Sequence, residues 1–210
     1  MTIEEIVARR VITEILHFTT NLGLVGILDS RSLKSRQRLE RDQRLEYIFS
    51  PNAAFRKDAD WLDYVNLSIS RVNSRFFSIS KNNWHREKDI WWCILSFDPI
   101  ILSHQGVYFT TTNNIYTAVR QNPGSGGLEA MFAESVVRWI GNSVVRNAKT
   151  SAHFPTCEQA EVLYPGELST DFLQEIYVSC EEDADQVFGQ IRALGHPEVR
   201  VRISPSMFGL

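Results

Sequence analysis

The sequence has little of what defines several large classes of protein. Its 210 residues include only three cysteines, which lie far apart without a Cys-x-x-Cys pair, so neither a disulfide framework nor a zinc site is expected. No apolar run approaches the roughly 20 residues that span a membrane, and the acidic, helix-periodic start differs from a signal peptide. We therefore expect a cytoplasmic protein that does not use a membrane.

Several familiar ligand-binding motifs are missing as well. There is no Gly-x-Gly-x-x-Gly for a Rossmann dinucleotide site, no Walker loop and no Gly-x-Ser-x-Gly nucleophile elbow. Four histidines show no metal-ligand spacing: His85, His104, His153 and His196. We therefore expect no metal in the site, and any nucleotide chemistry has to come from a different arrangement of residues.

Positive charge is absent from one long stretch. Residues 150–191 hold nine acids and no Lys or Arg, whereas residues 1–149 hold 19 Lys and Arg against 15 acids. Cations and aromatic rings alternate in the first part, as in proteins that hold single-stranded nucleic acid. An ordinary solvated surface explains the charge equally, and we expect Trp91 and Trp92 to lie in the core. The alternating residues are Arg56, Lys57, Trp61, Tyr64, Arg71, Arg75, Phe76, Phe77, Trp84, Trp91 and Trp92.

Length and composition predict a single globular domain over residues 1–210, since 43% hydrophobic and 22% charged residues are ordinary values. Periodicity predicts helices over 3–10, 128–140 and 183–194, the last with Phe188 inward, and one that Thr20 or Asn21 caps and that ends near residue 30. Apolar runs, aromatic and β-branched residues, and alternation predict strands over 11–18, 64–69, 89–97, 106–109, 159–164, 175–180 and 199–203. The order predicts an α+β fold, with a central mixed, mostly antiparallel sheet flanked by helices.

The C-terminal third carries a candidate catalytic carboxylate. Breaking a nicotinamide–ribose bond develops positive charge on the ribose, and a fixed carboxylate beside it stabilises that transition state more than the ground state. Glu161 is the candidate, and it can also take a proton from an incoming nucleophile. Gln159, two residues earlier on an extended chain, points to the same side and can orient the acceptor. Gln-x-Glu is nonetheless a common tripeptide, and most such glutamates are solvated.

The N-terminal segment supplies candidate ligands for a dinucleotide. His17 at the end of the predicted strand, and Thr19 beyond it, can bind ribose hydroxyls or a carboxamide. Asn21 is either a helix cap or a ligand, and Arg56 offers a guanidinium fork to a pyrophosphate. The hypothesis requires His17 and Glu161 to meet in one cleft.

Four stretches of the sequence share their order with the motifs of a known family. They are His17-Phe18-Thr19 with Asn21-Leu22 and the helix to Leu28; Arg56 with Asp63-Tyr64-Val65; Cys93-Ile94-Leu95 through Gly106–Thr110 to Asn113-Asn114; and Gln159-Ala160-Glu161 on to Pro165. They resemble the DarT-type DNA ADP-ribosyltransferases, the toxins of bacterial toxin–antitoxin and phage-defence systems. The first resembles the NAD-binding opening and the second a catalytic-loop arginine before a strand. The third resembles a central strand and the turn that follows, and the fourth resembles the segment with the catalytic glutamate.

The resemblance implies an ADP-ribosyltransferase-like fold and transfer of ADP-ribose from NAD, without a metal, to a base in single-stranded DNA. It implies Glu161 as the catalytic carboxylate, with Arg56 assisting. The implied NAD-binding residues are His17, Thr19, Asn21 and Arg56. Candidate substrate-binding residues are Gln159, Arg71 and Arg75. The family also implies an antitoxin partner, either a macrodomain or a related ADP-ribosyl hydrolase.

The modified base and the acceptor stay open at this point. Residues 68–75 read Ser-Ile-Ser-Arg-Val-Asn-Ser-Arg, whereas thymine-modifying members carry a Pro-Arg-Ser-Pro-like segment here, so guanine and thymine are both candidates. One alternative is an ADP-ribosyltransferase that acts on RNA or protein. Another is a non-catalytic nucleic-acid-binding domain, whose salt-sensitive binding would involve residues 34–57.

Overall fold

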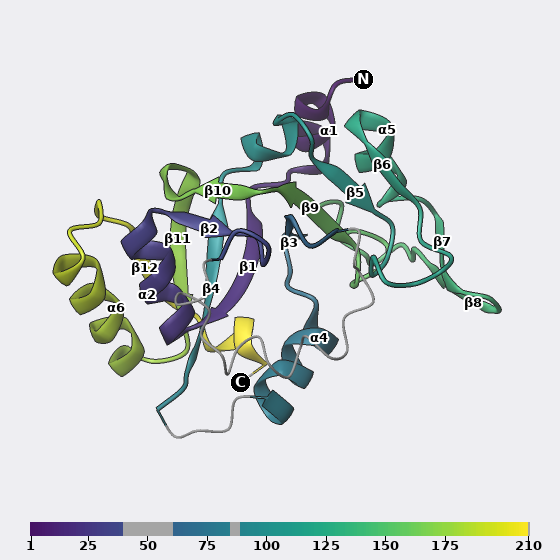
Figure 1. Cartoon of the computed structure of the whole chain (residues 1–210). Coiled ribbons are helices and arrows are strands. Elements are labelled where there is room, and N and C mark those ends of the chain that lie inside the picture. Colours follow the sequence, from purple (N-terminus) through teal and green to yellow (C-terminus); the bar gives the residue numbers. More distant parts are fainter. Residues whose placement is uncertain (40–60, 85–88, 210) are drawn as a thin grey trace.

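The computed structural model describes residues 1–39, 61–84 and 89–209, and its centre is an eight-stranded sheet (Figure 1). The strand order is β12-β11-β4-β1-β3-β9-β5-β6. All neighbours pair antiparallel except β11 and β12, which are parallel, so the mixed, mostly antiparallel sheet is confirmed. The bounds are β1 (Ile15–Thr20), β3 (Tyr64–Ile69), β4 (Trp92–Phe97), β5 (Tyr108–Thr110), β6 (Gln121–Pro123), β9 (Glu161–Pro165), β11 (Leu173–Val178) and β12 (Arg200–Ile203).

Helices and two short ladders surround this sheet. One ladder pairs β2 (Ser32–Lys34) with β10 (Glu167–Ser169), and the other pairs β7 (Ser135–Trp139) with β8 (Asn142–Val145). The α-helices are α1 (Ile3–Arg10), α2 (Asn21–Ser30), α4 (Ser74–Ile79), α5 (Gly124–Ala130) and α6 (Glu181–Ala193). A π-helical turn, η2 (Ser80–Trp84), extends α4, and the 3-10 turns are η3 (Pro99–Ser103), η4 (Thr170–Phe172) and η5 (Pro205–Phe208). None of the described helices is long and apolar enough to cross a bilayer.

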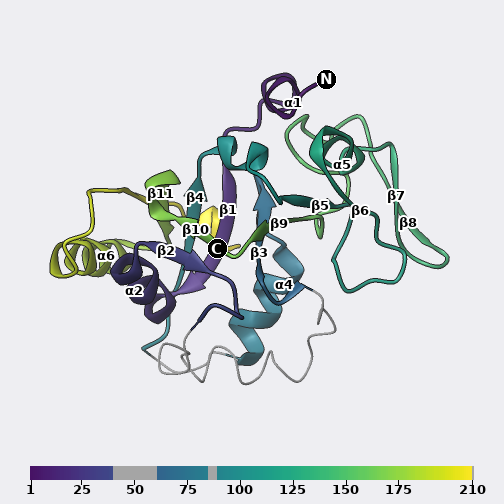
Figure 2. The same ribbon diagram turned by 45° about the horizontal axis from the view of Figure 1, so that its top comes forward.

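Apolar side chains fill both faces of the sheet. On one face, α2 and α6 lie side by side and contribute Leu24 and Val187 to a cluster that also contains Leu95 (Figures 1 and 2). On the other face, Phe77 of α4 joins a smaller cluster with Leu16. The central strands are therefore buried on both sides, which explains why β4 is a continuous apolar run in the sequence.

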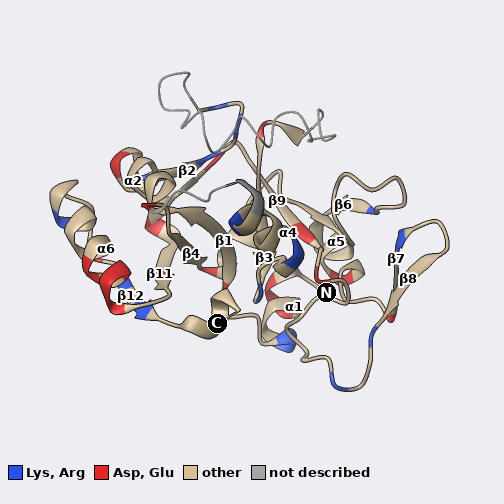
Figure 3. Cartoon of the chain, turned by 90° about the horizontal axis from the view of Figure 1, so that it is seen from below, with Lys and Arg blue, Asp and Glu red and all other residues tan. Residues whose placement is uncertain are grey.

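The acidic stretch of the sequence contributes the first turn of α6. Glu181, Glu182 and Asp183 stand there, where negative charge interacts favourably with the helix dipole. Figure 3 shows this acidic turn at the opposite end of the molecule from the β7–β8 hairpin. Part of the charge asymmetry is thus explained by helix stabilisation.

Most of the predicted elements are confirmed, with shifted ends. The strand at 64–69 has the predicted bounds, and Thr20 is the helix cap, since its Oγ1 accepts from the backbone N–H of Gly23 at 3.2 Å. The N-terminal strand begins only at Ile15, because Val11 adopts a left-handed conformation that ends α1. Phe188 was predicted to face inward but is 42% exposed.

The helix predicted over 128–140 is wrong beyond its first residues. Helix α5 begins at Gly124, four residues before the predicted start, and ends at Ala130; the β7–β8 hairpin follows. Gly141 occupies the hairpin turn with a φ of +79°, a conformation that glycine adopts without strain. A Gly-Asn pair between two runs of β-branched residues is a hairpin signal, and it outweighed the helical spacing of Val136 and Trp139.

Candidate active site

The central sheet divides at the boundary between β1 and β3. These two strands pair only at Ile15–Ile69 and Leu16–Ser68, although β1 continues to Thr20 along β4 and β3 pairs with β9 over Tyr64–Leu67. We call this point, where β1 and β3 stop pairing, the sheet fork. His17 is the first residue of β1 beyond the last pair.

His17 reaches across the sheet fork to the neighbouring strand. Its Nδ1 lies 3.0 Å from the backbone oxygen of Asn66, and because a carbonyl only accepts, Nδ1 carries the proton in this bond. Burial lowers the pKa of His17, and the bond to Asn66 partly offsets that effect. The neutral ring therefore keeps a lone pair on Nε2, which can accept a hydrogen bond from a ligand.

Glu161 begins β9, and among the described residues two donors hold its buried carboxylate. Nδ2 of Asn66 donates to Oε1 at 3.2 Å, and the backbone N–H of Asn114 donates to Oε2 at 2.8 Å. The residue is 7% exposed. Thr110 fixes its backbone, since the Thr110 hydroxyl accepts from the N–H of Glu161 and lies 3.1 Å from its carbonyl oxygen. The side chain is thus oriented before any substrate binds.

Asn66 joins His17 to Glu161. In a continuous sheet, paired residues share a face and successive residues alternate. Leu16 pairs with Ser68 and Leu67 pairs with Val162, so the side chain of His17 would share a face with Val162 and lie on the face opposite to Glu161. At the sheet fork the sheet is not continuous, so the backbone oxygen of Asn66 meets the imidazole while its amide meets the carboxylate. The two predicted residues therefore belong to one hydrogen-bonded group.

The other predicted NAD-binding residues flank this group. Thr19 and Asn21 are buried at the end of β1 and the start of α2. Nδ2 of Asn21 donates to the backbone oxygen of Asp89, while its Oδ1 is buried without a partner among the described residues. Thr19 packs against Gly23 so closely that an added Cβ at that glycine would lie 2.2 Å from its Oγ1. Arg56 lies outside the described residues.

Gln159 stands in a turn rather than on a strand. The strand predicted from residue 159 begins only at Glu161, because the N–H of Ala160 closes a turn onto the oxygen of Cys157. The extended-chain argument for Gln159 therefore does not apply. Its Oε1 instead accepts a hydrogen bond from the hydroxyl of Tyr116 at 3.2 Å.

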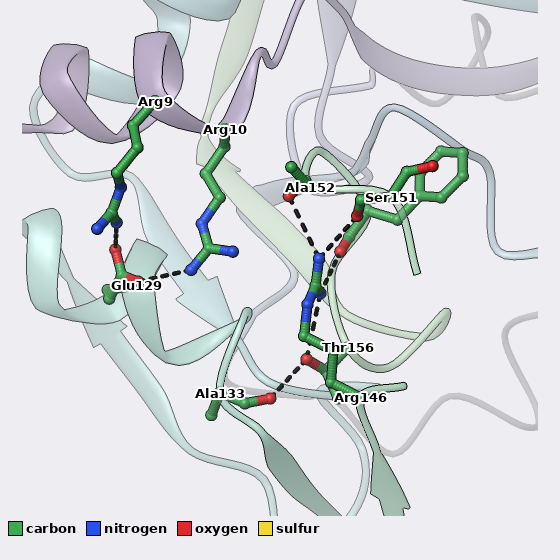
Figure 4. Close-up of polar contacts among 9 residues, drawn as sticks. Arg9, Arg10, Glu129, Ala133, Arg146, Ser151, Ala152 and Thr156 are labelled. Carbon is green, nitrogen blue, oxygen red and sulfur yellow. Dashed lines mark hydrogen bonds and ion pairs between the residues drawn. The ribbon is translucent and has the colours of Figure 1, made fainter. Parts of the chain in front are cut away.

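Arg146 holds the loop that leads into Glu161 (Figure 4). Its guanidinium donates at 2.7 Å to the backbone oxygens of both Ser151 and Phe154. The hydroxyl of Thr156 in turn donates to the oxygen of Ala133. Burial, followed by repulsion from nearby arginines, lowers the pKa of Arg146. This loop, residues 151–156, thus has a fixed path although it has no regular secondary structure.

The N-terminal helix contacts α5 and the residue Phe132 that follows it. Arg9 and Arg10 of α1 both pair with Glu129 on α5 (Figure 4). The Arg10 guanidinium lies 4.5 Å from the ring centre of Phe132. The Arg146 guanidinium lies 5.8 Å from the same ring. Helix α1 and Arg146, the residue that holds the loop before Glu161, therefore both contact Phe132.

The predicted DNA-binding residues differ in exposure. Arg71 donates to the backbone oxygen of Pro155 and lies over the ring of Phe154, and burial lowers its pKa. Arg75 is exposed on α4. As predicted, Trp92 lies in the core; Trp91 is half-buried and its indole N–H donates to Gln186.

The sequence did not point to Asn66 and Asn114, which hydrogen-bond to the carboxylate of Glu161. Asn66 sits in the middle of a strand, where asparagine is disfavoured, and this was a usable signal. Asn114 belongs to a stretch that resembles the family, but the sequence assigned it no role. Among the described residues, no group of three or more His, Cys, Asp or Glu side chains is placed to hold a metal ion.

A neutral imidazole acceptor on β1 and a fixed, buried carboxylate on β9, the two strands that flank β3, suit an enzyme that binds a ribose and stabilises positive charge on it, as ADP-ribosyltransferases do. Residues 16–209 match the family model described as "ssDNA thymidine ADP-ribosyltransferase, DarT". The chain therefore belongs to the DarT family and is an ADP-ribosyltransferase, which confirms the resemblance.

Solved structures show the same fold. Thermus sp. 2.9 DarT in complex with ADP-ribosylated ssDNA is 15% identical, with a TM-score of 0.66 over 93% of this chain and 95% of that chain. The same protein in complex with NAD+ is 16% identical, with a TM-score of 0.64 over 93% and 96%. Thermosipho africanus DarTG in complex with ADP-ribose is 16% identical, with a TM-score of 0.65 over 94% of this chain and 51% of that chain. No curated protein sequence is significantly similar.

Proposed function

We propose that this enzyme transfers ADP-ribose from NAD to a base in single-stranded DNA, with Glu161 as the catalytic carboxylate. The observation that carries the proposal is the double anchoring of that carboxylate by Asn66 and Asn114. A carboxylate already held in place needs no reorganisation when charge develops on the ribose, which is where such groups contribute most. His17, whose Nε2 can accept a hydrogen bond, is suited to a ribose hydroxyl.

The chemistry of the relatives supports the two substrates. Thermus DarT has been solved with NAD+ and with ADP-ribosylated ssDNA, and it shares the fold over nearly the whole chain. We propose that Thr19, Asn21 and Arg56 complete the NAD site and that Gln159, Arg71 and Arg75 face the DNA. We further propose that residues 1–210 act as one catalytic domain.

The modified base is either thymine or guanine. The family description names thymidine, and this favours thymine. The segment Ser68–Arg75, which departs from the thymine-modifying pattern, favours guanine. An oligonucleotide series decides between them.

We propose that the enzyme is the toxin of a toxin–antitoxin or phage-defence pair and that it acts in the cytoplasm. The matched Thermosipho DarTG chain is about twice as long as the part that this chain covers. A partner that removes ADP-ribose, a macrodomain or a related hydrolase, would reverse the modification.

The test is labelling of short single-stranded oligonucleotides in the presence of NAD, read by mass spectrometry. Each oligonucleotide lacks one base, and we expect that the one without the target base gains no mass. Glu161→Gln should abolish the gain, because it removes the charge and keeps the shape. The matched control is Glu158→Gln, since Glu158 is an outer residue that pairs with Arg138 at 3.9 Å. No gain on any oligonucleotide, with labelling of RNA or protein instead, would refute the DNA acceptor.

A further inference from the structure

Two buried polar atoms beside Glu161 have no hydrogen-bond partner among the residues that the structure describes. One is Nδ2 of Asn114, and the other is Oδ1 of Asn66. Both belong to the residues that hold the Glu161 carboxylate. Leaving a buried polar atom unpaired is unfavourable, so a native structure retains one only for a reason.

The side chain of Asn114 forms no hydrogen bond with the part of the chain that the structure describes. Its backbone N–H donates to Glu161 and its backbone oxygen accepts from Gln121, so the main chain is fixed without the amide. The neighbouring Asn113 is different, because its Oδ1 accepts from the N–H of Ile115 and shapes the turn. Asn114 is nevertheless only 8% exposed. A buried amide whose Nδ2 donates to none of the described residues is available for a ligand.

The three groups together define the chemistry of that ligand. Asn114 Nδ2 is a donor, Asn66 Oδ1 is an acceptor, and the carboxylate of Glu161 has about four lone-pair sites and accepts only. A hydroxyl can accept from an amide N–H and donate to a carboxylate at the same time. Two adjacent hydroxyls, as on a ribose, satisfy the donor, the carboxylate and the second acceptor together.

We propose, on the basis of the function proposed above, that Asn114 and Asn66 bind the two hydroxyls of the nicotinamide ribose of NAD. Asn114 Nδ2 donates to the 2′-hydroxyl, which donates to Glu161. Asn66 Oδ1 accepts from the 3′-hydroxyl. Asn114 is thereby a substrate-binding residue that aligns the ribose with the carboxylate, a role distinct from that of its backbone.

The test compares Asn114→Ala with wild type on three substrates: NAD and its analogues that lack the 2′- or the 3′-hydroxyl of the nicotinamide ribose. With NAD, the variant should lose about tenfold in kcat/KM, the loss expected for one hydrogen bond of this kind. With the 2′-deoxy analogue it should match wild type, because the bond is already absent. With the 3′-deoxy analogue the tenfold loss should return. Asn113→Ala is the matched control and should show no substrate-dependent loss.

Several results would overturn the proposal. An equal loss on all three substrates would make Asn114 merely structural, and a loss that vanishes only with the 3′-deoxy analogue would reverse the assignment of the hydroxyls. A loss that vanishes only with the 3-acetylpyridine analogue of NAD would assign the amide to the nicotinamide carboxamide. If Asn114→Ala unfolds, the same comparison is made with Asn114→Leu, which keeps the side-chain volume. Wild type that transfers no ADP-ribose would refute the proposed function itself, a separate outcome.

Discussion

Replacing Asn66 by aspartate tests whether Glu161 acts as an ionised group held by an amide. Asn66→Asp puts a carboxylate oxygen where Nδ2 now stands, 3.2 Å from Oε1 of Glu161. Two unit charges at that separation repel by about 5 kcal/mol at an effective dielectric constant of about 20. That energy corresponds to a rise of about four units in the pKa of one carboxyl group of the pair. The backbone oxygen that binds His17 is unchanged by the substitution.

The expected result is a new pH dependence. Near neutral pH the two carboxyl groups of Asn66→Asp should share one proton, as close acid pairs do. If the reaction needs an ionised Glu161, the transfer rate should fall sharply at pH 7 and rise about tenfold per pH unit up to the upper pKa of the pair.

The assay is the rate of oligonucleotide labelling between pH 5 and pH 9. Asn147→Asp adds the same charge at an exposed turn and keeps the Oδ1 atom that accepts two hydrogen bonds there. It should leave the pH profile unchanged. A profile of Asn66→Asp that coincides with wild type would refute the idea that Asn66 contacts a catalytic carboxylate.

Two further predictions concern the N-terminal segment. Gly23→Ala should destabilise the fold by roughly 1–3 kcal/mol, because the added Cβ would meet Thr19. Gly26→Ala, which has open space around the added Cβ, should stabilise the fold by roughly 0.5–1 kcal/mol. Equal melting temperatures of the two variants would contradict this prediction. Burial lowers the pKa of His17, so below about pH 6.5 the unfolded chain binds a proton that the folded chain does not, and wild type should lose stability as pH falls. The free energy of unfolding, measured with urea from pH 5 to pH 8, should depend less steeply on pH in His17→Gln than in wild type. An identical pH dependence in the two proteins would disprove the assignment.

Local signals decided much of the secondary structure. Aromatic and β-branched residues predicted the strand at 64–69, capping residues predicted the start of α2, and helical spacing predicted α1. Local signals failed where two of them competed, as in the segment that contains Val136 and Trp139. There the Gly141 turn and the β-branched residues allowed a hairpin, and pairing between β7 and β8 outweighed the helical spacing.

The sequence by itself determined the family, the main elements, and Glu161 and His17 as the residues to examine. Only the tertiary structure decided what holds them, because the donors to the Glu161 carboxylate lie 95 and 47 positions away along the chain, at Asn66 and Asn114. Periodicity and capping act within one element, whereas these contacts arise from strand order and from the point where β1 and β3 separate. A hydrogen-bonded group assembled from four distant segments has no local pattern to reveal it.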